Sequence, residues 1–482
     1  MTTSLRNLTS FGDVAAEDDA VLDYFLATDA VAQIERKQAF LVLGRKGAGK
    51  TAIVRHFTEG MSESRSRPLN LRGYPWAIHA QRIDRGGSEV EAYVSSWRYL
   101  IALEFASMVL EDSERPQHDK VEALTSFFKD NYGGINPSLS DVLRPKRLRI
   151  SKFSLQPTIL GNSIGGVELE RGPGDLQLGS ELNALTTSIM ESCYAIVANE
   201  SLGPYVLHFD ELDQGLSASD HTREKMLIGL IIAARDVRRE CAKVNAPMIP
   251  VVYLRTDLWD DLEFSDKNKI GQTLTLRLEW TNESLLALVN ERLKVKLAPS
   301  IHWESIVEPS LMRGSQTKWN HILARTFLRP RDVISFLNAS LSESRMRPDE
   351  ILVLSNSDII NAREQYSSYL KEELDDEILP HWPKWEQALQ ACSAMNTITF
   401  DREDFRREYE GRRTKDNPVG ADDALALLYR FSVIGYSRRS GYGGSSWAFQ
   451  YTDPQAGWDN AATRFKVHLG LKEYAKLREE RI

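Results

Sequence analysis

The sequence has few cysteines, no long apolar run and no excess of basic residues, and each absence excludes a class of protein. Cys193, Cys241 and Cys392 are the only cysteines among 482 residues. Their odd number and wide spacing argue against a disulfide framework or a zinc site and fit a reducing cytosol. The longest apolar stretches, such as residues 226–234, are far too short to span a bilayer.

The first residues lack a basic segment followed by an apolar one, so we expect a cytoplasmic protein rather than a secreted one. The net charge of −8 argues against a protein that coats nucleic acid, although it allows a local basic face. Residues 144–152 and residues 406–415 each gather basic side chains, and solvated surface charge is the alternative explanation for both. The length allows roughly two to four domains.

Residues 44–51, GRKGAGKT, match the phosphate-binding loop pattern G-x-x-x-x-G-K-[ST] at every fixed position. A short apolar run, residues 39–43, precedes this P-loop, and a helical stretch follows it. The glycines let backbone N–H groups approach a phosphate, the lysine reaches the β- and γ-phosphates, and the threonine hydroxyl suits Mg²⁺. The predicted nucleotide-binding residues are Gly44, Arg45, Lys46, Gly47, Ala48, Gly49, Lys50, Thr51 and Ala52.

A second strand that ends in acid completes the predicted site. Residues 205–209 are apolar and β-favouring, and they run directly into Asp210 and Glu211. This pattern indicates a Walker B strand, in which Asp210 holds Mg²⁺ and Glu211 polarises the attacking water. An acidic turn that merely caps a buried strand is the alternative. Asp213 is either a structural cap or an acid that supports these two.

A third strand, residues 249–254, ends in Arg255, Thr256 and Asp257. Ligands of open α/β sheets lie beyond the carboxyl ends of the strands, so Arg255 and Thr256 are candidate sensors of the γ-phosphate. Alternatively, Asp257 caps the next helix and its neighbours have no role. With further strands at residues 76–80 and 274–278, the pattern predicts an α/β fold with a doubly wound parallel sheet.

These blocks resemble the AAA+/STAND division of P-loop ATPases, and most closely a bacterial family of stand-alone P-loop ATPases. The resemblance covers residues 8–340. It rests on the P-loop, on HFDELD at 208–213, and on weaker blocks at residues 11–19, 254–257, 278–280 and 327–332. It implies that Phe11 and Gly12 lie against the adenine, and that such proteins often belong to bacterial defence or stress modules.

The resemblance also implies that Arg331, after Pro330, is a sensor on a helical lid that reaches the γ-phosphate. A surface ion pair with an acidic residue of the lid is the alternative for Arg331. Ring-forming relatives carry an arginine finger before the last strand, but residues 260–273 contain no arginine. Because lysine cannot copy the planar guanidinium fork, we expect a switch or a dimer rather than a hexameric ring.

The predicted domains are a P-loop ATPase core at residues 1–280, a helical lid at 281–345, and a linker helix with a winged-helix-like domain at 346–482. A β-rich insertion is expected at about residues 144–179, where apolar and polar residues alternate. Residues 97–110 are expected to form an amphipathic helix, and residues 321–341 a single helix of the lid.

In the last domain, predicted helices at residues 401–410 and 421–431 precede a hairpin, and Arg438 and Arg439 stand at the start of its glycine-rich turn. These two arginines could bind a nucleic-acid backbone, and so could the basic residues of 144–152. For Arg438 and Arg439, a protein contact or autoinhibitory packing is the alternative.

Together these features predict a protein that binds and hydrolyses ATP with Mg²⁺ to drive a conformational switch. Lys50, Thr51, Asp210 and Glu211 carry the chemistry, while Arg331, Arg255 and Thr256 report the γ-phosphate. One alternative is a non-hydrolysing, ATP-bound protein-interaction module, and another is a DNA-associated ATPase. The expected partners are ATP, Mg²⁺ and either another protein or a second copy of the chain, with no membrane contact.

Overall fold

The computed structural model describes residues 5–479 apart from 62–64, 72–73, 75–88, 144–147, 150–157, 160–161, 164–167, 170–175, 198–203, 213–220, 349–351, 440–444 and 455. The chain divides into two compact units. The sheet unit comprises Ala27–Arg45 and Lys50–Leu278, and the C-terminal unit comprises Met1–Leu26, Lys46–Gly49 and Glu279–Ile482. The sequence predicted that the P-loop ATPase domain begins at residue 1. In the structure, the segment Met1–Leu26 groups instead with the C-terminal unit.

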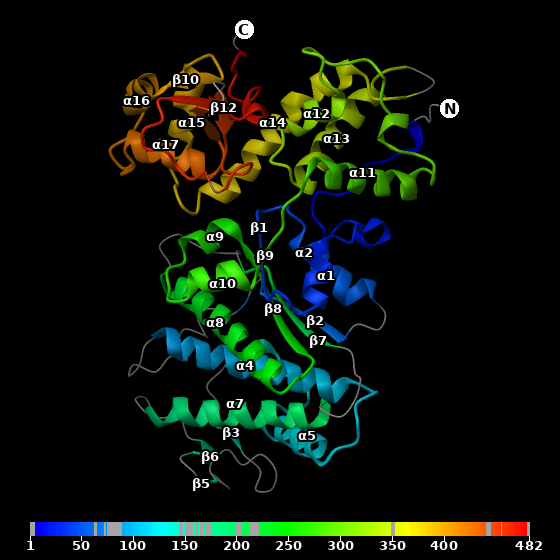
Figure 1. The fold of residues 1–482 in the computed structure, drawn as a ribbon, viewed down its shortest axis with the longest axis vertical. Coiled ribbons are helices and arrows are strands. Elements are labelled where there is room, and N and C mark those ends of the chain that lie inside the picture. Colours follow the sequence, from blue (N-terminus) through cyan, green and yellow to red (C-terminus); the bar gives the residue numbers. More distant parts are fainter. Residues whose placement is uncertain are drawn as a thin grey trace. The chain divides into compact units, whose positions relative to one another are not determined.

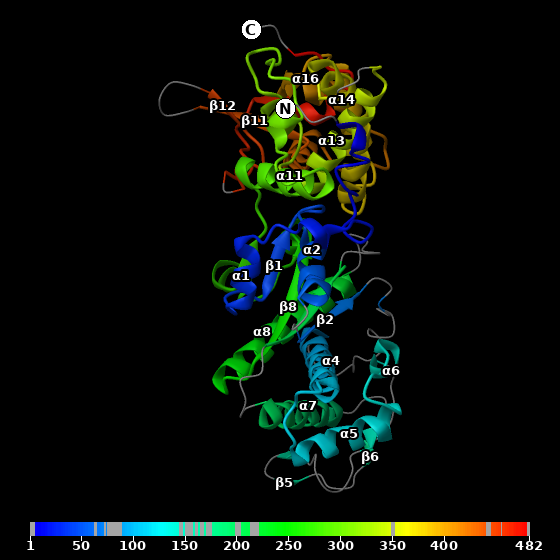
Figure 2. The ribbon, with the colours of Figure 1, turned by 90° about the vertical axis from the view of Figure 1, so that its right-hand side faces the viewer.

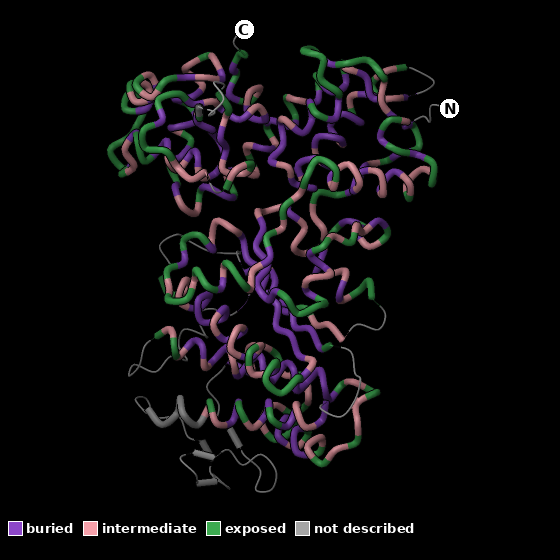
Figure 3. Tube along the Cα trace, viewed as in Figure 1, coloured by how far each residue is buried: buried purple, intermediate pink, exposed green. Residues whose placement is uncertain are grey.

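A five-stranded parallel sheet forms the centre of the sheet unit (Figure 1). Its strands, in spatial order, are β2 (Arg65–Asn70), β7 (Tyr205–Asp210), β8 (Met248–Arg255), β1 (Leu41–Gly44) and β9 (Thr275–Arg277). Every residue of β1, β7 and β8 is buried, whereas the two edge strands are partly exposed (Figure 3). Such continuous apolar strands are typical of a parallel sheet covered on both faces.

Helices cover both faces of this sheet, and Figure 1 shows α2 and α9 on opposite sides of it, while Figure 2 shows the same unit turned by 90°. The prediction of a doubly wound α/β fold is therefore confirmed. The helices of the unit are α1 (Asp29–Glu35), α2 (Lys50–Arg55), α4 (Glu89–Glu111), α5 (Asp119–Tyr132), α6 (Leu139–Leu143), α7 (Leu176–Val197), α8 (His221–Lys243), α9 (Thr256–Asp261) and α10 (Lys267–Thr273), with a π-helical turn η3 (His56–Gly60) after α2.

Three details of the sheet unit differ from the predictions. The strand beside β7 is β2, whereas the strand predicted at Trp76–Ala80 lies outside the described residues. The helix predicted at residues 97–110 is longer and not amphipathic, because α4 is buried nearly all round and packs against both α7 and α8. Within residues 144–179, β3 (Leu148–Arg149) pairs with β6 (Glu168–Leu169) and β4 (Thr158–Ile159) with β5 (Asn162–Ser163), but helix α7 already begins at Leu176.

The C-terminal unit begins with a bundle of helices: α11 (Asn282–Lys296), α12 (Lys318–Leu323), α13 (Pro330–Arg345) and α14 (Asn356–Ile378). Thr281 and Ser355 cap α11 and α14 through reciprocal side-chain bonds with the third helical residue. The single helix predicted at residues 321–341 is instead two helices. The physical reason is Pro330, which starts a helix well but disfavours helical backbone at the residue before it.

The remaining residues form a four-stranded antiparallel sheet with three helices. Its strands are β10 (Thr399–Asp401), β13 (Arg464–Val467), β11 (Ile434–Arg439) and β12 (Ser445–Ala448), in that spatial order. The helices are α15 (Glu386–Ala394), α16 (Arg402–Glu410) and α17 (Ala421–Arg430). Short 3₁₀ turns complete the unit: η1 (Leu5–Asn7), η2 (Val21–Tyr24), η4 (Trp303–Ser305) and η5 (Leu469–Leu471). The predicted order of two helices followed by a hairpin is confirmed.

Each unit has its own hydrophobic core. One core gathers buried residues of the sheet unit from Phe40 to Ile270, and the other gathers those of the C-terminal unit, including Leu5, Leu8 and Phe11. Among the described residues, no helix combines the length and the apolar character that crossing a bilayer requires.

Candidate functional site

The P-loop has the backbone that its sequence predicts. It leaves β1 at Gly44 and enters α2 at Lys50. Gly47 and Gly49 have φ values of 78° and 100°, in the region that residues with a Cβ atom rarely adopt. The Lys50 ammonium donates to the carbonyl oxygens of Gly44 and Arg45, at 3.0 and 3.2 Å. The loop therefore folds around its own lysine, next to the N-terminus of a helix.

The acidic pair Asp210 and Glu211 lies at the end of a central strand of the sheet. Asp210 is the last residue of β7, is 5% exposed, and stands on the strand against which α2 packs. Glu211 follows with a φ of 57°, a left-handed conformation that turns the chain away from the sheet. Leu212 is buried again. Asp213 lies outside the described residues.

Beneath this edge, His208 is a core residue of β7. Its side chain is fully buried, and its Nδ1 lies 2.9 Å from the Tyr253 hydroxyl. Burial lowers the pKa of His208 to about 3, so the imidazole is neutral. Burial, together with the Asp210 carboxylate, raises the pKa of Tyr253 well above its usual value. A neutral hydrogen-bonded pair thus supports the strand end that carries Asp210.

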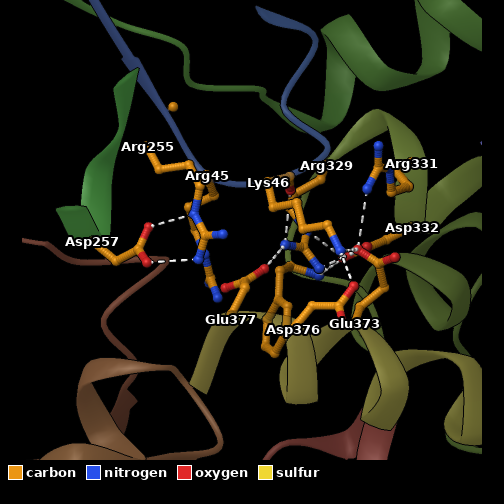
Figure 4. A network of polar contacts seen from close by, with 12 residues as sticks. Arg45, Lys46, Arg255, Asp257, Arg329, Arg331, Asp332, Glu373, Asp376 and Glu377 are labelled. Carbon is orange, nitrogen blue, oxygen red and sulfur yellow. Dashed lines mark hydrogen bonds and ion pairs between the residues drawn. The ribbon is translucent and has the colours of Figure 1, made fainter. Parts of the chain in front are cut away.

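The parallel register aligns the end of β8 with the P-loop. Arg255, the last residue of β8, pairs with Gly44 across the sheet. The Arg255 side chain is 7% exposed and forms a bidentate ion pair with Asp257, at 3.0 and 2.7 Å (Figure 4). Thr256 begins α9, and Asp257 lies in its first turn without capping it. The sensor roles of Arg255 and Thr256 stay predictions.

The tip of the P-loop, Lys46–Gly49, makes its contacts within the C-terminal unit. Trp280 donates its indole N–H to the carbonyl of Ala48 at 2.9 Å, and Arg329 donates Nη1 to the carbonyl of Lys46 at 2.9 Å. The backbone N–H of Arg331 lies 3.5 Å from the carbonyl oxygen of Gly47. The carbonyl groups of three consecutive loop residues, Lys46, Gly47 and Ala48, therefore each face an N–H donor of the C-terminal unit.

Arg329 belongs to a buried cluster of charges (Figure 4). Its guanidinium contacts Asp332 at 2.9 and 3.0 Å and Glu377 at 2.5 Å, and all three residues are 3% exposed or less. Asp332 also accepts a bond from the Phe327 backbone N–H. Burial alone lowers the pKa of Arg329, but the two carboxylates outweigh it and hold that pKa well above its usual value. The guanidinium is therefore charged and fixed in orientation.

Lys46 and Arg331 contact acids of α14 (Figure 4). The Lys46 ammonium pairs with Asp376 and lies 3.4 Å from Glu373, which also lies 3.2 Å from Arg331. Arg331 donates its Nε–H to the carbonyl of Val14 at 2.9 Å. In this structure Arg331 thus forms an ion pair with an acidic residue, which was the alternative to a sensor role. Its role as a γ-phosphate sensor stays a prediction.

The segment at Phe11 and Gly12 is tied into the C-terminal unit. Phe11 is fully buried, its N–H donates to Asn338 at 2.8 Å, and its carbonyl accepts from Arg292 at 2.9 Å. Asn338 also donates to the carbonyl of Gly12, whose φ is 126°. The Phe11 ring faces the protein interior, and the predicted contact of this segment with an adenine stays a prediction.

Two residues with contacts to the loop had no predicted role, namely Trp280 and Arg329. Both stand in blocks that the sequence singled out, but no local pattern marks their contacts. Their partners on the loop are more than 200 residues away along the chain. The signal that could have found them is indirect, since Arg329 precedes the proline that starts α13.

Comparison with known proteins gives a match for one segment of the chain. The family model described as the FunZ-associated C-terminal helical domain matches residues 283–375, which run from α11 into α14. This is less than half of the chain, so it characterises that helical segment only. Among curated proteins, none matches the chain.

Two solved structures are similar to the chain at a low level. The Orc1 protein of Aeropyrum pernix, in complex with DNA, is 11% identical, with 97% of each chain covered and a TM-score of 0.36. Cdc6p from Pyrobaculum aerophilum is 11% identical, with 93% of this chain and 92% of that chain covered and a TM-score of 0.31. Similarity at this level does not establish a shared fold or function.

Proposed function

We propose that this chain is an ATPase of the AAA+/STAND type that binds ATP at its P-loop and uses hydrolysis to reset a conformational switch. The observation that carries the proposal is the P-loop itself. It joins a buried central strand to a helix, contains two glycines with positive φ, and is followed by a strand that ends in Asp210 and Glu211. Backbone N–H groups, a helix N-terminus and Lys50 all favour a bound phosphate.

The residues present fit Mg²⁺, which prefers oxygen ligands and retains several waters. Thr51 would supply a hydroxyl and Asp210 a carboxylate, from a helix and a strand that pack together. When bound, the ion would neutralise charge on the phosphates. No cluster of three or more His, Cys, Asp or Glu side chains suited to a metal exists in the described part of the chain. The ion would therefore depend on the nucleotide for further ligands.

Glu211 is the residue best suited to polarise the attacking water, because it follows Asp210 at the strand end. Arg331, Arg255 and Thr256 are the candidate sensors of the γ-phosphate. The switch is supported by the contacts of Arg331 and Lys46 with α14. Phosphate and the acids of that helix compete for the same basic side chains, so nucleotide would bias the position of α14.

Replacing Lys50 tests nucleotide binding. We expect Lys50→Ala to weaken ATP binding about 10- to 100-fold, because a hydrogen bond to a charged group contributes about 1.5–3 kcal/mol. Titration calorimetry with Mg-ATP measures the change, and Lys243→Ala, which removes an exposed lysine of the same unit, is the matched control. Equal affinity of Lys50→Ala and the parent chain would remove the P-loop assignment.

Replacing Glu211 tests hydrolysis separately. We expect Glu211→Gln to bind ATP like the parent chain while phosphate release falls about 10²- to 10⁴-fold, the usual contribution of a general base. Glu263→Gln removes an exposed carboxylate of the same unit and serves as the control. A parent chain that binds ATP tightly without turnover would instead support the non-hydrolysing interaction module.

A DNA-associated ATPase is the second candidate, favoured by the order helix, strand, two helices and hairpin in residues 386–448. This order is that of a winged-helix domain, with Arg438 on the hairpin. The exposed residues Asp422 and Asp423 at the start of α17 and the ion pair of Arg438 with Asp453 weaken the case, since they oppose a phosphate backbone. Salt-dependent DNA binding that is lost in Arg438→Ala would favour this candidate.

A further inference from the structure

The contacts of the P-loop carbonyls determine where its N–H groups point. In a planar trans peptide, the carbonyl of one residue and the N–H of the next lie on opposite sides of the chain. No cis peptide bond occurs in the described residues. Donors on the carbonyls of Lys46, Gly47 and Ala48 therefore turn the N–H groups of Gly47, Ala48 and Gly49 to the other side.

Those three N–H groups are the ones that a P-loop offers to phosphate. A flexible loop would have to align them when the anion binds, and each ordered residue costs about 1–2 kcal/mol of conformational entropy. Glycines at positions 47 and 49 make this cost larger, because glycine loses the most freedom. Donors that already hold the carbonyls reduce the cost before nucleotide arrives.

Two of the three donors are side chains in defined orientations. Arg329 is fixed by Asp332 and Glu377, and its charge strengthens the bond to the carbonyl of Lys46. The Trp280 indole N–H lies 2.9 Å from the carbonyl oxygen of Ala48, and the indole ring reaches within 4.0 Å of the place where a Cβ of Gly49 would lie. The third, the N–H of Arg331, is at 3.5 Å and is the weakest.

We propose that Trp280 and Arg329 are positioning residues that hold the P-loop backbone in its phosphate-binding conformation. Both act through the loop carbonyls and need no contact with the nucleotide. The proposal rests on the proposed function, since it concerns the same loop. It gives Trp280 and Arg329 an indirect role in nucleotide affinity, which they exert through the loop and which is separate from any sensor of the γ-phosphate.

Trp280→Phe tests the proposal, because phenylalanine keeps an aromatic ring and removes the N–H donor together with part of the indole ring system. We expect the affinities for Mg-ATP and Mg-ADP to fall by the same factor, about three- to tenfold, since both nucleotides carry a β-phosphate. In phosphate-release assays KM should rise, with kcat changed less than about twofold. A γ-phosphate sensor would instead affect ATP alone.

Trp382→Phe is the matched control. Trp382 also donates its indole N–H, to Asn417 at 3.2 Å, within the C-terminal unit but not to the loop. We expect this variant to bind both nucleotides like the parent chain. Arg329→Lys retains the charge beside Asp332 and Glu377 without the guanidinium fork, so we expect weaker binding of both nucleotides there as well.

The outcomes separate the two proposals. Unchanged affinity of Trp280→Phe for ATP and ADP, in a chain whose binding requires Lys50, would overturn the positioning role and leave the proposed function intact. A lower melting temperature of Trp280→Phe with unchanged affinity would have the same meaning. A parent chain that binds no ATP would overturn the proposed function and the positioning role with it. If Arg329→Lys does not fold, Trp280→Phe still decides.

Discussion

At the scale of single residues, Glu211 occupies a backbone conformation that few residues adopt. Its φ of 57° costs an L-residue about 1–2 kcal/mol relative to ordinary regions. Its neighbours Asp210 and Leu212 are both buried, so packing on either side can hold the turn. Strain of this kind concentrates at functional sites, because folding alone gives no reason to retain it. Lys37, Asn245 and Leu328 have similar positive φ values, so the conformation does not by itself assign a role to Glu211.

His321 provides a prediction about pH. Its side chain is 5% exposed, and its Nε2 accepts from Arg363 at 2.7 Å, so its Nδ1 carries the proton toward Gln316. Burial, together with the charges of Arg325 and Arg363, lowers the pKa of His321 from 6.5 to about 3. As the pH falls, His321 therefore takes up a proton in the unfolded chain before it does so in the folded chain. The neutral, buried His321 contributes its full stabilisation above about pH 6.5, and this contribution is lost progressively as the pH falls below that value.

We expect the free energy of unfolding to depend less on pH in His321→Gln than in the parent chain between pH 7 and 5. At the acidic end of this range, the two slopes of unfolding free energy against pH should differ by nearly one bound proton, which is about 1.4 kcal/mol per pH unit. Urea unfolding at several pH values measures it. His302→Gln, which replaces an exposed histidine of the same unit, should leave the slope unchanged. Equal slopes in all three chains would contradict the prediction.

At the scale of elements, α14 presents one acidic face. Glu373, Asp376 and Glu377 are three or four residues apart, so they lie on the same side of the helix. Glu373 contacts both Lys46 and Arg331, Asp376 contacts Lys46, and Glu377 contacts Arg329. Basic residues next to a phosphate-binding loop are thus already engaged by carboxylates. The helix that holds them lies partly within the segment matched by the family model.

Glu373→Gln should tighten ATP binding, because it removes the carboxylate that lies near both Lys46 and Arg331. We expect an affinity about two- to fivefold higher, as for a partly exposed ion pair worth up to about 1 kcal/mol. Glu372→Gln removes the same charge from an exposed neighbouring position and should have no effect. Titration with Mg-ATP decides, and unchanged or weaker binding in Glu373→Gln would count against competition by α14.

At the scale of the whole molecule, the two units have separate cores, and the N-terminal segment belongs to the core of the C-terminal unit. Leu5 bonds through its N–H to the carbonyl of Leu352, and Phe11 is held by Asn338 and Arg292. The C-terminal unit is therefore built from three separate segments of the chain, Met1–Leu26, Lys46–Gly49 and Glu279–Ile482. Separate cores are expected to unfold in separable transitions.

Phe11→Ala should destabilise the C-terminal unit by about 3–5 kcal/mol, the usual cost of truncating a buried phenylalanine. Because seven of the ten tryptophans belong to that unit, its transition dominates the fluorescence during urea unfolding. Phe105→Ala, in the buried helix α4, should shift the other transition instead. A shift of the same transition by both variants would mean that the two units unfold together.

Much of the fold and half of the candidate site follow from local sequence. The P-loop, the strand before Asp210 and the helix caps at Thr281 and Ser355 each depend on residues a few positions apart, whose backbone preferences are fixed by their own chemistry. For the same reason, the order of helices and hairpin near the C-terminus could be predicted. The two-helix break before Pro330 was missed, although proline marks it.

What the sequence alone determined is a phosphate-binding loop followed by an acidic strand, because glycine, lysine and aspartate have these roles wherever the surrounding strand and helix form. What only the tertiary structure decided is which groups surround the loop. The pairing of Arg329 with Glu377, the bond from Trp280 to Ala48 and the burial of Phe11 join residues far apart in the sequence. Such contacts depend on how helices pack, and helix packing is not encoded in any short pattern.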